Sequence, residues 1–197
     1  MSRRSQNARN KRKIFAALFT AALVAAALLA SLPAASAGAR KARCGKAHAA
    51  PRTLSRRQMR TSILCLVNRV RRHHGLHKLD FNAELRDSAT AHSVSMVVHD
   101  YFAHEGPGGS VDSRIARAGY LKKARRFKIG EDIGGGAGRR FGSPLGVFEE
   151  WMHSPPHREN ILDPKFRDLG IGVARGSPFG GHRGAATYTA DFGARTD

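Results

Sequence analysis

The stretch that decides the fold is WMHSPPHRENIL, at residues 151–162. Ser143-Pro144 precedes it and favours the start of a helix, because proline suits the first helical position. The apolar face of that helix is predicted at Val147, Phe148 and Trp151. Pro155-Pro156 predicts its end, since proline removes a helical hydrogen bond and clashes with the preceding turn. We therefore expect a rigid backbone to aim the side chain of His157.

Three more segments place polar side chains in apolar or glycine-rich surroundings: YFAH (101–104), IGEDIG (129–134) and EEWM (149–152). Glu131 is the most informative residue, because a carboxylate between two isoleucines needs a polar partner if it is buried. His104 has a simpler interpretation as the C-terminal cap of a helix. Arg158 and Asn160 likewise have a structural interpretation, as partners of loop carbonyls.

Helices are predicted first along the chain and strands last. One helix begins at Thr53 or Ser55 and ends near His74, a second begins at Asn82, and a short third ends at Gly119. Apolar residues alternate with small or polar ones at 169–173 and 188–192, as expected of two strands joined by a glycine-rich turn. The glycine-rich run at 134–138 lacks the Lys-Ser/Thr of a phosphate loop and is interpreted as a flexible link. This order, without βαβ alternation, predicts an α+β domain.

The N-terminus has the pattern of an export signal. Basic residues without acidic ones precede an apolar run from Ile14 to Leu32, and Ala35-Ser36-Ala37 fits a signal peptidase site. We predict a signal peptide at 1–37, a flexible basic arm at 38–58 and one domain at 59–197. The alternative for the leader is an uncleaved membrane anchor, since the run is nearly long enough to span a bilayer. Both alternatives place the domain outside the cytoplasm, extracellular or associated with the cell envelope.

The formal charge of +19 narrows the classes of partner. Nucleic acid is an unlikely partner, because the arginines are scattered singly, without a dense basic helix or interleaved aromatics. Anionic components of the cell envelope fit such a surface, and a basic exterior without a partner is the alternative. Cys44 and Cys65 form one disulfide if the compartment is oxidising, or else Cys65 is a buried thiol among apolar residues.

Taken in this order, the segments resemble those of the CAP superfamily, which is named for cysteine-rich secretory proteins, antigen 5 and plant pathogenesis-related 1 proteins. The resemblance runs from about Ser62 to Phe192 and is to the bacterial, secreted branch. It rests on LVNRVR (66–71), AHS (91–93), YFAH (101–104), GEDI (130–133), where the family usually has Asn in place of Asp132, and the opening stretch at 151–162.

The resemblance implies an α-β-α sandwich, with helices on both faces of a small antiparallel sheet. It also implies an open cleft in which His104, Glu131 and His157 match three of the family's four His and Glu residues and could hold a divalent metal such as zinc. The family's second Glu corresponds to Ser154, and Glu150 is expected to point elsewhere on its helix.

These features favour a protein that acts mainly by binding, with an extracellular protein or a lipid as further partner classes. Two imidazoles and one carboxylate can hold an open zinc site. The alternative function is therefore a metal-assisted, peptidase-like hydrolase of envelope or secreted substrates, and the sequence leaves the question of enzymatic activity open.

Overall fold

The computed structural model describes residues 44–180 and 183–196. The predicted signal peptide at 1–37 and the first part of the predicted arm therefore lie outside the described residues. Within the described part of the chain, no helix combines the length and the apolar character that crossing a membrane requires.

Four strands form one sheet in the order β1-β3-β4-β2. They are β1 (Asp80–Phe81), β2 (Arg126–Ala137), β3 (Asp168–Arg175) and β4 (Ala185–Thr196). The two long pairings, β2 with β4 and β3 with β4, are antiparallel, whereas the two residues of β1 pair with β3 in parallel. Most of β3 and β4 is buried, which is expected where both faces of a sheet are covered.

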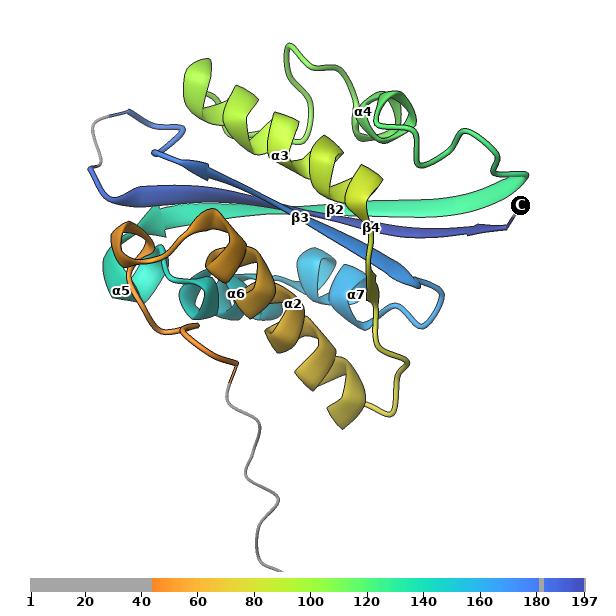
Figure 1. Cartoon of the computed structure of the whole chain (residues 1–197), viewed down its shortest axis with the longest axis horizontal. Coiled ribbons are helices and arrows are strands. Elements are labelled where there is room, and N and C mark those ends of the chain that lie inside the picture. The colour runs from red at the N-terminus through yellow and green to blue at the C-terminus, as the bar shows by residue number, and fades with distance from the viewer. Residues whose placement is uncertain (1–43, 181–182, 197) are drawn as a thin grey trace, which may run out of the picture. The chain divides into compact units, whose positions relative to one another are not determined.

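Helices cover both faces of this sheet, as Figure 1 shows. One face carries α3 (Ala83–Val98) and α4 (Val111–Arg117), and the other carries α2 (Arg56–His73), α6 (Pro144–His153) and α7 (Pro155–Leu162). The single-turn helices η1 (Pro51–Thr53) and α5 (Gly138–Phe141) complete the set. The predicted α+β class and the α-β-α sandwich are confirmed, with the short parallel strand β1 added to the antiparallel sheet.

Two glycines of β3 allow α3 to lie close to the sheet. A Cβ atom on Gly170 would lie 2.1 Å from the amide nitrogen of Arg86, and one on Gly172 would lie 2.1 Å from the carbonyl carbon of Ala89. Both distances are too short for any side chain, so these positions require glycine. The resulting close packing holds α3, and the polar residues on its inner face, against the middle of the sheet.

Trp151 anchors the opposite layer. Its ring is 1% exposed, and its Nε1 donates a hydrogen bond of 2.8 Å to the carbonyl oxygen of Ile133 in β2. A buried indole N–H needs such an acceptor. The bond ties α6 to β2, and the expected burial of Trp151 on a helix is confirmed.

Two sequence expectations differ from the structure. Pro155-Pro156 ends α6 as predicted, but the two prolines also occupy the first turn of α7, where the missing N–H groups have no helical partner to lose. Gly134, Gly135 and Gly136 were expected in a flexible link, yet they pair with β4 as part of β2. Glycine is required at position 136, because a Cβ atom there would lie only 2.8 Å from the backbone of Phe141.

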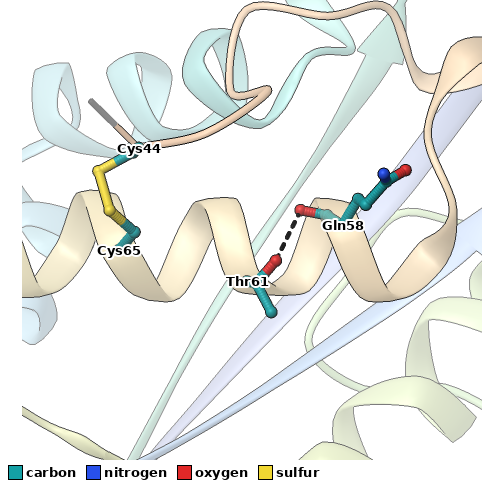
Figure 2. Close-up of a disulfide and its surroundings, with 4 residues drawn as sticks. All are labelled: Cys44, Gln58, Thr61 and Cys65. Atoms are coloured by element: carbon teal, nitrogen blue, oxygen red, sulfur yellow. Dashed lines mark hydrogen bonds between the residues drawn. A yellow bond between two sulfur atoms is a disulfide. The ribbon is translucent and has the colours of Figure 1, made fainter. Parts of the chain in front are cut away.

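The disulfide between Cys44 and Cys65 is present, with its Cα atoms 5.5 Å apart. Figure 2 shows it joining the segment before α2 to the middle of that helix. Cys44, Ala47 and Leu54 are buried, and Leu145 donates its amide hydrogen to the carbonyl oxygen of Ala47. The described part of the predicted arm, from Cys44 onward, is therefore packed rather than flexible, because its apolar side chains and the disulfide fix it to the helical layer.

Replacing both cysteines with serine is expected to lower the free energy of unfolding by about 3 kcal/mol, because the bond closes a loop of moderate length in the unfolded chain. Urea unfolding of the oxidised protein and of the Cys44→Ser/Cys65→Ser variant measures the difference. Addition of a reductant should bring the unaltered protein to the stability of the variant and leave the variant unchanged. Equal stability of the two oxidised proteins would contradict the expectation.

Candidate functional site

Glu131 is the centre of a buried polar cluster on the face of the sheet that α3 and α4 cover. Its side chain is 1% exposed, and each carboxylate oxygen has a partner. Oε1 accepts a hydrogen bond of 2.8 Å from Nδ1 of His104, and Oε2 accepts one of 2.5 Å from the guanidinium of Arg114. Both partners reach Glu131 from outside β2, so the cluster joins the sheet to α4 and to the segment that carries His104.

Arg114 fixes the position of that segment. It lies in α4 and is 4% exposed. Its NH1 donates to the carbonyl oxygen of His104 at 2.9 Å and to that of Gly109 at 2.6 Å, while its NH2 pairs with Glu131. One side chain thus holds both the backbone of His104 and the carboxylate to which the imidazole of His104 is bonded.

The charges of the cluster are set by its burial and its partners. Burial alone would raise the pKa of Glu131, but the hydrogen bond from His104 and the charges of His92 and Arg114 lower the pKa below its ordinary value. Burial lowers the pKa of His92, whose Nε2 lies 3.0 Å from the carbonyl oxygen of Ala103 and 3.8 Å from Glu131. Glu131 is therefore ionised at neutral pH.

The rings of His104 and His157 are neighbours, and His157 lines an open cleft. The side chain of His104 is 47% exposed, and the centroids of the two rings are 6.5 Å apart. Burial, and then the charge of His104, lower the pKa of His157. The ring of His157 is consequently neutral at neutral pH and has one nitrogen lone pair to offer.

A cavity of about 410 Å³ opens beside His157. Glu150 and Trp151 line it from α6, Ser154 lines it from the junction between α6 and α7, and Phe102 lines it from the segment of His104. Glu150 was expected to point elsewhere on its helix, but it is among the residues that line this cavity. The cavity therefore has a carboxylate even though serine occupies the position of the family's second glutamate.

Asp132 points to the opposite face of the sheet, as strand alternation requires. Its Oδ1 accepts a hydrogen bond of 2.8 Å from Nδ2 of Asn160 in α7, and its Oδ2 has no partner among the described residues. Burial raises the pKa of Asp132 to about 8, with a further contribution from the charge of Glu131, against the effect of the bond from Asn160. The structural interpretation of Asn160 is consistent with this contact, since its amide joins α7 to β2.

The structure thus brings His104 and Glu131 into contact and places His157 opposite His104. Sequence reasoning missed three members of the cluster: His92, Arg114 and Asp191. Asp191 is fully buried, and its Cα lies opposite that of Glu131 in the pairing of β2 with β4. Its flanking residues, Ala190 and Phe192, were a signal of the same kind as the isoleucines around Glu131. Arg114 gave no comparable signal, because it is one of many arginines in the chain.

The three predicted metal ligands do not surround a common position for a zinc ion. Within the described residues, no group of three His, Cys, Asp or Glu side chains is arranged to hold a metal ion. Both oxygens of Glu131 are already bonded, one of them to a cation. A zinc ion binds imidazole nitrogen at about 2.0–2.1 Å, so two rings with centroids 6.5 Å apart would have to approach further. Metal binding by His104, Glu131 and His157 stays a prediction.

Comparisons with known proteins agree with the motifs. The family model described as "CAP: Cysteine-rich secretory protein family" matches residues 64–192. The Bacillus subtilis protein YkwD is 35% identical over 108 residues, which are 54% of this chain and 39% of that protein. The Bacillus subtilis membrane protein YlbC is 33% identical over 114 residues, which are 57% of this chain and 31% of that protein. The chain thus spans less than half the length of each of these relatives.

Solved structures share the fold. An extracellular protein of Bacillus anthracis that contains an SCP domain is 26% identical with a TM-score of 0.56, over 71% of this chain and 43% of that chain. An outer surface protein of Borrelia burgdorferi has a TM-score of 0.59 over 73% of this chain and 97% of that chain. Its sequence identity is 16%, so this likeness concerns the fold alone.

Replacing Arg114 with glutamine is expected to cost about 3–5 kcal/mol of stability, because it leaves the charge of Glu131 buried without its cation. Arg117→Gln is the matched control, since among the described residues the side chain of this arginine of the same helix bonds only to the carbonyl oxygen of Gly108, in an exposed position. Urea unfolding measures the free energy of unfolding of both variants. The double variant Arg114→Met/Glu131→Leu should recover much of the loss, because it removes both buried charges. Equal effects of Arg114→Gln and Arg117→Gln would contradict the role given to Arg114.

Asp132→Asn is expected to stabilise the protein increasingly as the pH rises. The folded protein keeps the proton of Asp132 up to a pH of about 8, whereas the unfolded chain releases it near its ordinary pKa of 3.8. The free energy of unfolding therefore falls between these values, by at most about 1.4 kcal/mol per pH unit, and asparagine removes that fall. Thermal unfolding from pH 4.5 to 8.5 measures how the stability of the variant and of the unaltered protein changes with pH, with Glu159→Gln as an exposed control. Parallel pH profiles for Asp132→Asn and the unaltered protein would refute the expectation.

Proposed function

The chain belongs to the cysteine-rich secretory protein (CAP) family, and we propose that it acts outside the cytoplasm as a binding protein whose ligand enters the cleft that His157 lines, beside His104. Its N-terminal sequence has the pattern of an export signal. The similar Bacillus anthracis protein is described as extracellular. Both observations support the location, and the cleft supports the activity.

The observation that carries the proposal is the way in which His104 is held. An imidazole that is 47% exposed is fixed through Nδ1 by a buried carboxylate, and a buried arginine fixes that carboxylate in turn. Burying two charges is costly, and a pair of apolar residues often serves stability equally well. A buried ion pair that aims an exposed ring toward a second histidine is therefore better explained by ligand binding than by stability.

A divalent cation is one ligand that this arrangement favours. With Nδ1 of His104 committed to Glu131, Nε2 is left for a ligand, and His157 offers a second nitrogen. Carboxylates commonly orient metal-binding histidines from behind in this manner. We propose that Glu131 orients His104 rather than contacting the cation, and that Glu150, which lines the adjoining cavity, supplies the carboxylate nearest to the ligand.

Binding is favoured over hydrolysis because of the state of Glu131. A metal-assisted hydrolase needs a carboxylate or another base that is free to take a proton from water. Glu131 is neutralised by Arg114 and bonded to His104, so it is poorly suited to that role. The proposed function is accordingly capture of a ligand at the cleft.

Calorimetric titration of zinc into the exported protein near pH 7.5 tests the proposal, since imidazole binds metal in its neutral form. One-site binding is expected, and His104→Ala/His157→Ala should abolish it. Glu131→Gln should weaken it by about 10–100-fold, as loss of an orienting partner does. His73→Ala/His74→Ala is the matched control, because it removes another pair of neighbouring imidazoles, whose centroids are 5.7 Å apart.

The His73→Ala/His74→Ala variant should bind zinc at the cleft with the same affinity as the unaltered protein. Equal loss of binding in both double variants would mean that zinc binds exposed histidines without selectivity. Unchanged affinity in His104→Ala/His157→Ala would refute the cation part of the proposal.

A further inference from the structure

A basic groove of about 360 Å³ lies at the end of the sheet where β2 begins and β4 ends. Figure 1 shows this end beside the C-terminal label, away from α5. Arg126, Phe127 and Lys128 line the groove from β2, Arg195 from β4, and Lys165 and Arg167 from the segment before β3. Five of these six side chains are cationic and none is acidic.

The fold gathers these residues from three separate parts of the chain. In the pairing of β2 with β4, Phe127 lies opposite Arg195 and Lys128 lies opposite Ala194. The amide of Arg167 donates to the carbonyl oxygen of Gly193 at 2.9 Å, which attaches the segment before β3 to the same end of the sheet. The arginines are scattered in the sequence, but the sheet register brings this group together in space.

Among the described residues, most of this charge has no carboxylate partner. Lys128 is the only member of the group with a described carboxylate in ion-pair range, from Asp163. The guanidinium of Arg195 donates to the carbonyl oxygen of Tyr120, and that of Arg167 donates to two backbone carbonyls. These bonds fix the directions of the two side chains, and no described carboxylate lies in ion-pair range of either.

Strand alternation places two cations of β2 on one face of the sheet. Arg126 and Lys128 are two residues apart on the strand, so they share a face and are about 6.8 Å apart along it. Phe127, which is 52% exposed, points to the other face together with Arg195, its partner in β4. Positive groups repeated along an open groove match the repeated anionic groups of an extended polymer.

We propose that this basic groove binds a linear polyanion, whose phosphate or carboxylate groups pair with the Arg and Lys side chains that line it. Arginine forks are suited to both kinds of anion. Single-stranded nucleic acid is disfavoured, because its binding sites stack successive bases on several aromatic rings, and this groove has one.

The groove is separate from the cleft and does not depend on it. The cavity beside His157 meets β2 at Ile133, Gly134 and Gly135, whereas the groove meets it at Arg126–Lys128. About seven residues of extended strand, or roughly 23 Å, separate the two places. Failure at one site therefore leaves the other proposal standing.

Binding of fluorescently labelled polyphosphate to the full chain tests the proposal, measured between 50 and 200 mM salt. Arg126→Gln/Lys165→Gln removes two cations whose side chains make no hydrogen bond or ion pair within the described residues. Arg69→Gln/Arg72→Gln removes the same charge from the exposed side of α2 and is the matched control. Any contribution of the basic leader is the same in all three proteins and cancels in the comparison.

The groove variant is expected to bind about 10-fold more weakly at 50 mM salt, with a slope of log K against log salt that is smaller by about 1.5, because two counterion-releasing contacts are lost. The control should change affinity by less than about twofold. A parallel titration with polyglutamate distinguishes carboxylate from phosphate polymers, and a groove-dependent signal with either supports the proposal.

Equal weakening in the groove variant and the control would overturn the proposal, since attraction would then be spread over the whole surface. Unchanged affinity in the groove variant would overturn it as well. Tighter binding of oligothymidylate than of either polymer, lost in Phe127→Ser, would replace the polyanion with single-stranded nucleic acid.

Discussion

The buried ion pair between Glu131 and Arg114 is the interaction on which the site depends. A carboxylate in the middle of a covered sheet would be protonated or displaced unless a cation compensated it. Arg114 supplies the compensation and, with its remaining donors, also holds the backbone of His104 and Gly109. The position of an exposed histidine is thus set by a contact that solvent does not reach, and screening by salt affects it little.

The sheet determines which polar residues can meet. Neighbouring residues of β2 point to opposite faces, so Glu131 meets α4 while Asp132 meets α7. The same strand carries the cleft at one end and the basic groove at the other. Glycines of β3 bring α3 close to the sheet, which buries His92 beside Glu131. Backbone geometry therefore comes first, and the chemistry of the site follows from it.

Features of the fold with local causes could be predicted from the sequence. The sequence predicted the helix that carries Trp151 and the family motifs, because each depends on nearby residues. It also predicted the disulfide between Cys44 and Cys65 as one of two alternatives, because this bond depends on a single pair of residues. The second helix after Pro155 was missed, since proline both ends a helix and suits the start of the next. The role of Gly134–Gly136 was missed because their place in β2 depends on pairing with β4, far along the chain.

Side-chain networks were harder to predict than elements, and the arginines show why. Arg114 and Arg126 look alike in the sequence, yet one is 4% exposed and paired with Glu131 while the other is exposed beside further cations. Buried Arg114 has its partners within the protein, Glu131 and two backbone carbonyls, and it serves the architecture of the cleft. A cation that the fold leaves beside like charges at the surface raises the local potential and attracts an anion from outside. The same residue type thus supports internal positioning at one place and external recognition at another, and only the three-dimensional register separates the two roles.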